Sequence, residues 1–75
     1  MHENKSLKIL RVRYDLTQEA MAQKLGMSRQ AYAKIENGFS SGTISFWIKV
    51  QYLFNITSEE MWSLINDEAK EGAKV

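Results

Sequence analysis

Residues 28–37 combine long polar side chains at a spacing that would bring them together on a helix. With 100° between successive residues, one arc of about 140° holds five side chains: Arg29, Gln30, Ala33, Lys34 and Asn37. Tyr32 and Ile35 point the other way. One face of the expected helix is therefore polar and cationic with a small residue in its middle, and the other face is apolar.

The side chains on this polar face suit the edges of nucleobases. An arginine donates two parallel hydrogen bonds to O6 and N7 of guanine, and a glutamine pairs with N6 and N7 of adenine. Ala33 between them permits close approach and a contact with a thymine methyl group. The face taken alone is also compatible with an ordinary solvated helix surface.

Other kinds of chemistry find little support. The chain has no cysteine, so disulfides and thiolate metal sites are excluded. The single histidine, His2, adjoins Met1, and the acidic pairs Glu59–Glu60 and Asp67–Glu68 fit a solvated helix surface better than a general acid. We therefore expect no enzymatic activity, no metal and no cofactor.

The length and the charge distribution narrow the class of protein. A chain of 75 residues forms one domain, residues 1–75, and its core is small. No apolar run exceeds three residues and no secretory signal is visible, so we expect a cytoplasmic protein without a membrane segment. The net charge is +1, but residues 1–38 carry +3 and residues 39–75 carry −2. This asymmetry favours a negatively charged partner that binds the first half of the chain.

The apolar residues recur at helical spacing throughout, which predicts an all-α fold. Thr17 and Ser28 are good N-caps, while Asp15, Gly26 and Asn55 suit the ends of helices. We expect five helices, over about residues 4–14, 17–25, 28–37, 43–54 and 57–68. The core spans about residues 5–68, and residues 69–75 are expected to be a frayed tail.

The second and third helices are joined by only three residues, Gly26 to Ser28, so they must cross steeply. Ala22 is small enough to sit where the two backbones approach. A shared core would take apolar side chains from both helices: Met21, Leu25, Met27, Tyr32 and Ile35. These are the features of a helix-turn-helix unit, whose second helix enters the DNA major groove.

The sequence resembles the helix-turn-helix domains of the phage-repressor and Cro-like (XRE) family. The residues that carry the resemblance are Leu16–Glu19, Met21–Ala22, Leu25–Arg29 and Lys34–Gly38, with a weaker match through Trp47, Val50, Phe54, Ile56 and Met61. The chain departs from the family at Gly42, where proline is frequent, and at Gln51, where a small apolar residue is preferred. The resemblance implies a compact five-helix, lambda-repressor-like domain and a prokaryotic or phage regulator of transcription, expected to be a repressor, that binds specific double-stranded DNA sequences.

The resemblance also implies roles for individual residues. The base-reading positions would be Arg29, Gln30 and Lys34, with Ala33 between them. Contacts to the DNA backbone would come from Thr17, Gln18, Ser28, Asn37, Phe39, Ser40 and Ser41, and Gln18 would also brace the third helix. Arg11 and Glu36 would form a structural pair between the first and third helices.

The second half of the chain is rich in apolar side chains. On the fourth helix one arc holds Ile44, Trp47, Ile48, Val50 and Phe54, which predicts burial on more than one side, and Gln51 within it should find a hydrogen-bond partner. We expect a homodimer, because so small a domain has little surface with which to cover all of these residues. Its interface would include Phe46, Leu53, Trp62 and Ile65, the alternative being that these side chains are all core.

Two functions of different classes stay open. The first is the DNA-binding regulator, for which a symmetric dimer would present two recognition helices about one DNA turn apart. The second is a protein-binding module on the same fold, such as an antitoxin or a phage regulator whose main partner is another protein.

Overall fold

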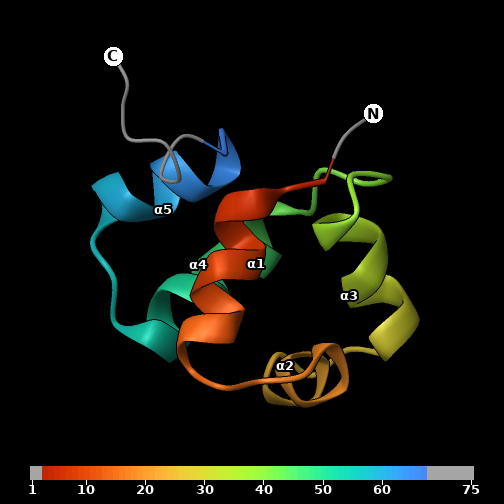
Figure 1. Ribbon diagram of the computed structural model, residues 1–75. Coiled ribbons are helices and arrows are strands. Elements are labelled where there is room, and N and C mark those ends of the chain that lie inside the picture. Colours follow the sequence, from red (N-terminus) through yellow and green to blue (C-terminus); the bar gives the residue numbers. More distant parts are fainter. Residues whose placement is uncertain (1–2, 68–75) are drawn as a thin grey trace.

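The computed structural model describes residues 3–67, and in that range the chain forms five α-helices and no strand. The helices are α1 (Lys5–Arg13), α2 (Gln18–Lys24), α3 (Arg29–Glu36), α4 (Ile44–Phe54) and α5 (Ser58–Ile65). They pack around one core (Figure 1). The predicted all-α, five-helix fold is confirmed. In residues 3–67 no helix has the length and apolar character needed to cross a membrane.

Each helix begins at a side chain that accepts a hydrogen bond from the backbone N–H three residues further on. These capping residues are Asn4, Thr17, Ser28, Thr43 and Thr57. At α5 the arrangement is reciprocal, because Glu60 also accepts from the backbone N–H of Thr57 at 3.0 Å. The caps satisfy donors that a helix start leaves free, and the starts predicted at Thr17 and Ser28 are confirmed.

Residues in the left-handed conformation end the first four helices. Asp15, Gly26, Gly38 and Asn55 have φ angles of 60°, 72°, 90° and 54°. After Gly26, for example, the N–H of Met27 bonds back to the Ala22 carbonyl at 3.0 Å. This pattern closes the last helical turn and ends the helix.

Helix α5 ends earlier than the sequence predicted. It stops at Ile65, and Asp67 then takes a φ of 56°. The expected extension to about residue 68 was wrong because the chain turns at Asn66 and Asp67. The predicted frayed tail, residues 69–75, lies outside the described residues.

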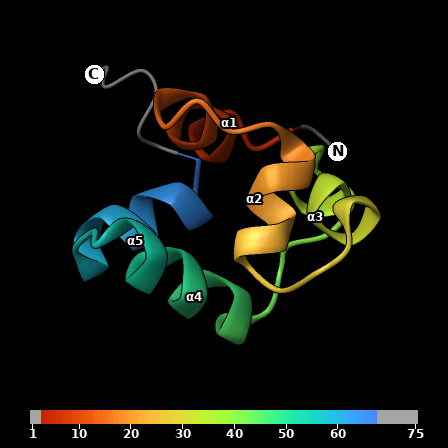
Figure 2. The same ribbon diagram turned by 90° about the horizontal axis from the view of Figure 1, so that it is seen from below.

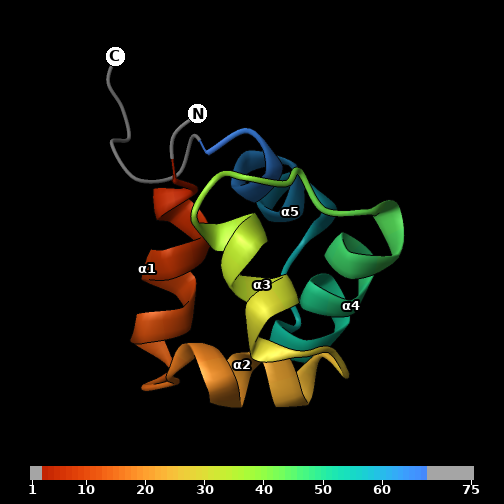
Figure 3. The same cartoon turned by 90° about the vertical axis from the view of Figure 1, so that its right-hand side faces the viewer.

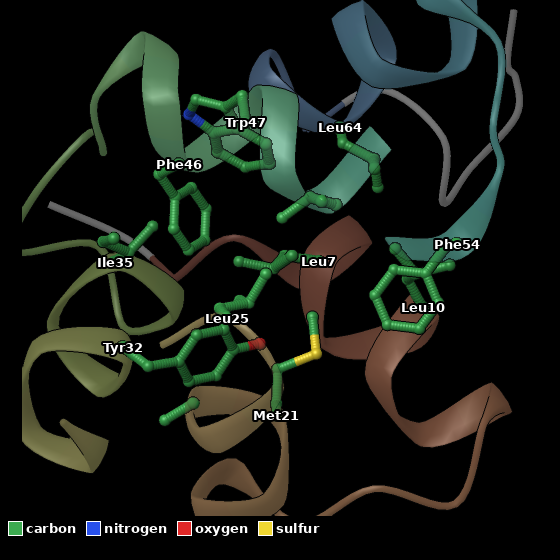
Figure 4. Close-up of a cluster of buried hydrophobic side chains, with 12 residues drawn as sticks. Leu7, Leu10, Met21, Leu25, Tyr32, Ile35, Phe46, Trp47, Phe54 and Leu64 are labelled. Carbon is green, nitrogen blue, oxygen red and sulfur yellow. The ribbon is translucent and has the colours of Figure 1, made fainter. Parts of the chain in front are cut away.

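The core draws on all five helices and the turn after α2. Its buried apolar side chains are Leu7, Leu10, Met21, Ala22, Leu25, Tyr32, Ile35, Phe46, Trp47, Val50, Phe54 and Leu64. Figure 4 shows them converging around Leu7. The ends of the domain are joined by Asn4, whose side-chain amide donates to the Leu64 carbonyl at 2.8 Å and whose N–H donates to the Glu36 carbonyl at 2.7 Å.

Helix α4 buries one side only, so the prediction that it is covered on more than one side was wrong. Its buried face is formed by Phe46, Trp47, Val50 and Phe54. Ile44 and Ile48 were expected on the buried arc but are 71% and 50% exposed. They lie about 60° and 100° beyond Trp47 around α4, on a side that no other helix of the described chain covers. Gln51 does find a partner, since its amide donates to Oγ of Ser58 at 3.2 Å.

Candidate nucleic-acid interface

Helices α2 and α3 cross steeply, as the three-residue link between them requires. Figure 3 shows α2 running across one end of α3. Ala22 is buried at their junction, and Met21 and Tyr32 are fully buried beside it. Because these contacts belong to the core, they fix which side of α3 faces inward and which faces solvent.

The outward face of α3 is open. Arg29, Gln30, Lys34 and Asn37 are exposed and Ala33 is half-buried, whereas Tyr32 and Ile35 point into the core. One shallow surface hollow is lined by Arg29, Gln30, Ala33, Lys34, Asn37 and Phe39. The fold therefore brings the four residues predicted to read bases together with two of those predicted to contact the DNA backbone.

The exposed charges of α3 are all positive. Arg29 and Lys34 project from the open face, and the one acidic residue of the helix, Glu36, is only 2% exposed and forms an ion pair with Arg11. No carboxylate of α3 therefore offsets the two cations. A surface of this kind attracts a polyanion, and the side-chain N–H groups of Arg29 and Lys34 are then available for hydrogen bonds to it.

A buried cluster around Glu36 fixes the inner side of α3. Its Oε2 accepts from Nε of Arg11 and from the Tyr32 hydroxyl, both at 2.8 Å, and its Oε1 accepts from the Gln18 amide at 2.7 Å. Arg11 also donates to the Leu16 carbonyl in the turn between α1 and α2. The predicted pairing of Arg11 with Glu36 is present, and the cluster joins α1, α2 and α3.

The cluster holds Glu36 in its ionised form. Burial by itself would raise the pKa of Glu36, but the hydrogen bonds from Arg11, Gln18 and Tyr32 outweigh burial and hold its pKa below the ordinary value. The hydrogen bond to Glu36 raises the pKa of Arg11, and burial followed by the Glu36 charge raises that of Tyr32. The carboxylate is thus a fixed acceptor at neutral pH, around which its three donors are oriented.

The residues predicted to contact the DNA backbone lie at the starts of α2 and α3, at the end of α3 and in the loop that follows it. Thr17 and Ser28 are exposed at the starts of α2 and α3, where their hydroxyl oxygens accept from the N–H groups of Ala20 and Ala31 at 3.0 and 3.1 Å. Gln18 uses one N–H of its amide on Glu36. An amide has two such hydrogens, so Gln18 can brace α3 and still donate outward.

The loop after α3 is folded back on the helix. The N–H groups of Phe39 and Ser40 both donate to the Lys34 carbonyl, at 2.8 and 3.1 Å. Phe39, Ser40 and Ser41 are exposed along this loop. Their placement beside Lys34 follows from these two bonds, which hold the loop at the edge of the surface hollow.

Sequence reasoning missed Trp47 as the residue that holds the far end of this loop. Its indole N–H donates to the Ser41 carbonyl at 3.0 Å. Gly42 has a φ of 81°, and a Cβ there would lie 3.0 Å from the same indole nitrogen and 3.2 Å from a ring carbon of Phe46. The signal was in the sequence, because glycine replaces the proline that is frequent in the family and a tryptophan follows five residues later.

The four residues predicted to form a dimer interface differ in exposure. The prediction for Phe46 was wrong, because this side chain is 5% exposed and offers almost no surface to a partner. Its ring packs edge-on against Trp47, with ring centroids 4.9 Å apart. Leu53 borders a hollow with Tyr14 and Lys24. Trp62 is exposed on α5, and Ile65 is partly buried against the core.

Among residues 3–67, no three His, Asp or Glu side chains are grouped as a metal site would require.

Comparison with known proteins gives two matches. The family model described as helix-turn-helix matches residues 7–61. An uncharacterized HTH-type transcriptional regulator from Methanocaldococcus jannaschii is 36% identical over 62 residues, which is 83% of this chain and 94% of that protein. No solved structure gives a significant match.

Proposed function

The chain belongs to the helix-turn-helix family of DNA-binding regulators, and from that premise we propose that it recognises specific double-stranded DNA sequences by placing α3 in the major groove. The observation that carries the proposal is the open face of α3. Arg29, Gln30 and Lys34 are exposed side by side there, with no carboxylate of the same helix among them.

In this arrangement some side chains would contact the bases and others would contact the DNA backbone. Arg29 would bond to guanine and Gln30 to adenine, while half-buried Ala33 would let the helix approach the base edges closely. Phosphates would be held on one side by Gln18, flanked by Thr17 and Ser28. On the other side they would be held by Asn37 and the loop of Phe39, Ser40 and Ser41. Backbone contacts fix the register in which the base contacts are read.

We also propose that the protein acts as a repressor and does so as a homodimer. Occupation of a promoter by a compact five-helix domain would exclude other proteins from the same groove. Two copies would present two α3 helices to half-sites about one DNA turn apart.

A protein-binding module on the same fold is the second candidate. The observation that favours it is the exposure of large apolar side chains in the second half, above all Tyr52 at 89% and Ile44 at 71%. If a protein were the main partner, these side chains would lie in the contact and the open face of α3 would have little affinity for DNA.

A salt titration of binding to random duplex DNA separates the two functions. We expect binding at low salt, with an affinity that falls steeply and linearly on a log–log plot as salt rises, because cations on the protein release ions condensed on the DNA. Lys34→Ala should weaken this binding and flatten its salt dependence. Lys24→Ala is the matched control, since both lysines are exposed in the last turn of their helices.

The control should bind like the unaltered protein. Absence of binding at low salt, or equal losses in the Lys34 and Lys24 variants, would favour the protein-binding module.

A further inference from the structure

Phe39 is a large apolar side chain that the core does not use. It is 67% exposed, and it belongs neither to the buried cluster nor to the residues packed against that cluster. Its ring stacks on no other ring within residues 3–67. Packing inside the described part of the chain therefore does not explain a phenylalanine at this position.

Phe39 instead lies at the edge of the open face of α3. Figure 2 shows α3 at one edge of the molecule, away from α5, with the loop that follows it. The shallow hollow on this face is lined by Arg29, Gln30, Ala33, Lys34, Asn37 and Phe39. Four of these six side chains carry hydrogen-bonding groups, whereas Ala33 and Phe39 offer only apolar surface. The hollow thus combines both kinds of contact.

Phe39 has no hydrogen-bond donor to give to a phosphate. Its side chain is apolar, and its backbone N–H already donates to the Lys34 carbonyl at 2.8 Å. The hydroxyls of Ser40 and Ser41 are the side-chain donors of this loop that suit phosphates. What Phe39 offers to DNA is therefore the apolar surface of its ring.

The major groove of DNA contains one group that matches such a surface. The base edges in this groove carry hydrogen-bond donors and acceptors, and thymine adds a C5 methyl group. Phenylalanine is among the side chains that make an apolar contact with this methyl group. Such a contact distinguishes thymine from cytosine, which carries a hydrogen atom at the same position.

The charges around Phe39 indicate from which side DNA approaches the ring. Phe39 also borders a second hollow, and the residues that line it include the acidic Glu3 and Asp67. Carboxylates disfavour a polyanion there, whereas the cations Arg29 and Lys34 line the hollow on α3. The ring therefore meets DNA on the side of α3, where the base edges lie in the proposed arrangement.

The loop holds Phe39 in place before DNA binds. The N–H groups of Phe39 and Ser40 both donate to the Lys34 carbonyl. Further along, the indole N–H of Trp47 donates to the Ser41 carbonyl at 3.0 Å. A loop that is fixed in advance loses little freedom on binding, so a contact as small as one methyl group can add to the affinity.

We propose that Phe39 contacts the C5 methyl group of one thymine in the DNA site and thereby selects thymine over cytosine at that position. The inference rests on the proposed function, because it requires α3 to lie in the major groove. Phe39 follows the C-terminal end of α3, whereas Arg29 is the first residue of the helix. The selected thymine is therefore at a different base position from the guanine that Arg29 would read.

Deoxyuridine substitution tests the contact, because uracil differs from thymine only in lacking the C5 methyl group. A duplex selected from a random pool is prepared with each thymine replaced in turn, and the dissociation constants are measured. At one position the unaltered protein should bind the uracil duplex roughly fourfold more weakly, the loss expected for one methyl group. Phe39→Ala should bind the thymine and uracil duplexes of that position with equal affinity.

Two further variants serve as controls. Phe39→Leu keeps an apolar side chain and should keep the preference for thymine. Tyr52→Ala removes an exposed aromatic ring from α4, outside the hollow, and should also keep it. The preference is a ratio between two duplexes measured with the same variant, so a change in the amount of folded protein cancels.

Equal binding of thymine and uracil at every position by the unaltered protein would overturn the inference. So would a preference for thymine that Phe39→Ala retains in full. A loss in Phe39→Ala that is the same on every duplex would also overturn it, by placing the ring on the sugar–phosphate backbone. Each of these results requires binding and leaves the proposed function intact, whereas absence of binding to any duplex would overturn both.

Discussion

Replacement of Arg11 by alanine is expected to lower the free energy of unfolding by about 3 kcal/mol, because it would leave the Glu36 carboxylate buried without its cation. Glu36 is 2% exposed and ionised, and Gln18 and Tyr32 would be its remaining side-chain donors. The variant also loses the bond from Arg11 to the Leu16 carbonyl, which holds the turn between α1 and α2. Urea unfolding followed by far-ultraviolet circular dichroism measures the change.

Arg13→Ala is the control for this prediction. Arg13 lies two residues further along α1 but is exposed, and its replacement should change the unfolding free energy by no more than about 0.5 kcal/mol. If the two alanine variants unfold at the same urea concentration, the ion pair does not join α1 to α3 in the way described. A large loss in the Arg11 variant alone supports the view that the inner side of α3 is fixed by charge as well as by packing.

Arg29→Ala is expected to cost about 1–3 kcal/mol of binding free energy on a preferred DNA site and to relax the preference at one base position of each half-site. The reason is that a bidentate arginine contact discriminates guanine from the other bases, whereas alanine at the same place accepts any of them. Selection from a random pool of duplexes, carried out in parallel with the unaltered protein and the variant, measures both effects.

The pattern of the loss identifies the kind of contact that Arg29 makes. A loss confined to one position of the selected site supports base reading. A uniform loss across all sequences would instead assign Arg29 to a phosphate. Arg13→Ala again serves as a control, because it removes the same charge from α1 and should leave the selected sequence unchanged.

The helices and most of their boundaries, the end of α5 excepted, could be predicted because they depend on local chemistry. Thr17 and Ser28 cap the helices that follow them, and Gly26 adopts the left-handed conformation that a short link needs. The orientation of α3 was also predictable, since polar and apolar residues separate cleanly on its two faces. For the same reason the residues expected at its open face do lie together.

The burial of α4 could not be predicted in the same way, because eight of its 11 positions are apolar or aromatic and they fall all round the helix. Residue type alone did not distinguish Phe46, which packs in the core, from Ile44, which is exposed two residues earlier. That choice depends on where α5 and the α3–α4 loop lie, and those positions follow from tertiary contacts. The predicted dimer interface inherited this error, because it placed the buried side chain of Phe46 at the surface.

The loop between α3 and α4 illustrates a second limit of sequence reasoning. The departure from proline at Gly42 was visible in the sequence, but its consequence was not. The structure pairs it with Trp47, whose indole N–H reaches the Ser41 carbonyl across a space that a Cβ at Gly42 would fill. The glycine thus leaves room for the indole, whose hydrogen bond holds the loop that borders the open face.

The central claim is that the open face of α3 makes the contacts with DNA. Nuclear magnetic resonance tests it most directly, by following backbone and side-chain nitrogen signals while a selected duplex is added to the labelled protein. We predict that the largest changes occur at Arg29, Gln30 and Lys34 and in the loop of residues 39–41, with small changes on the exposed side of α4. Changes concentrated at Ile44, Ile48 and Tyr52, with the signals of α3 unmoved, would contradict the claim.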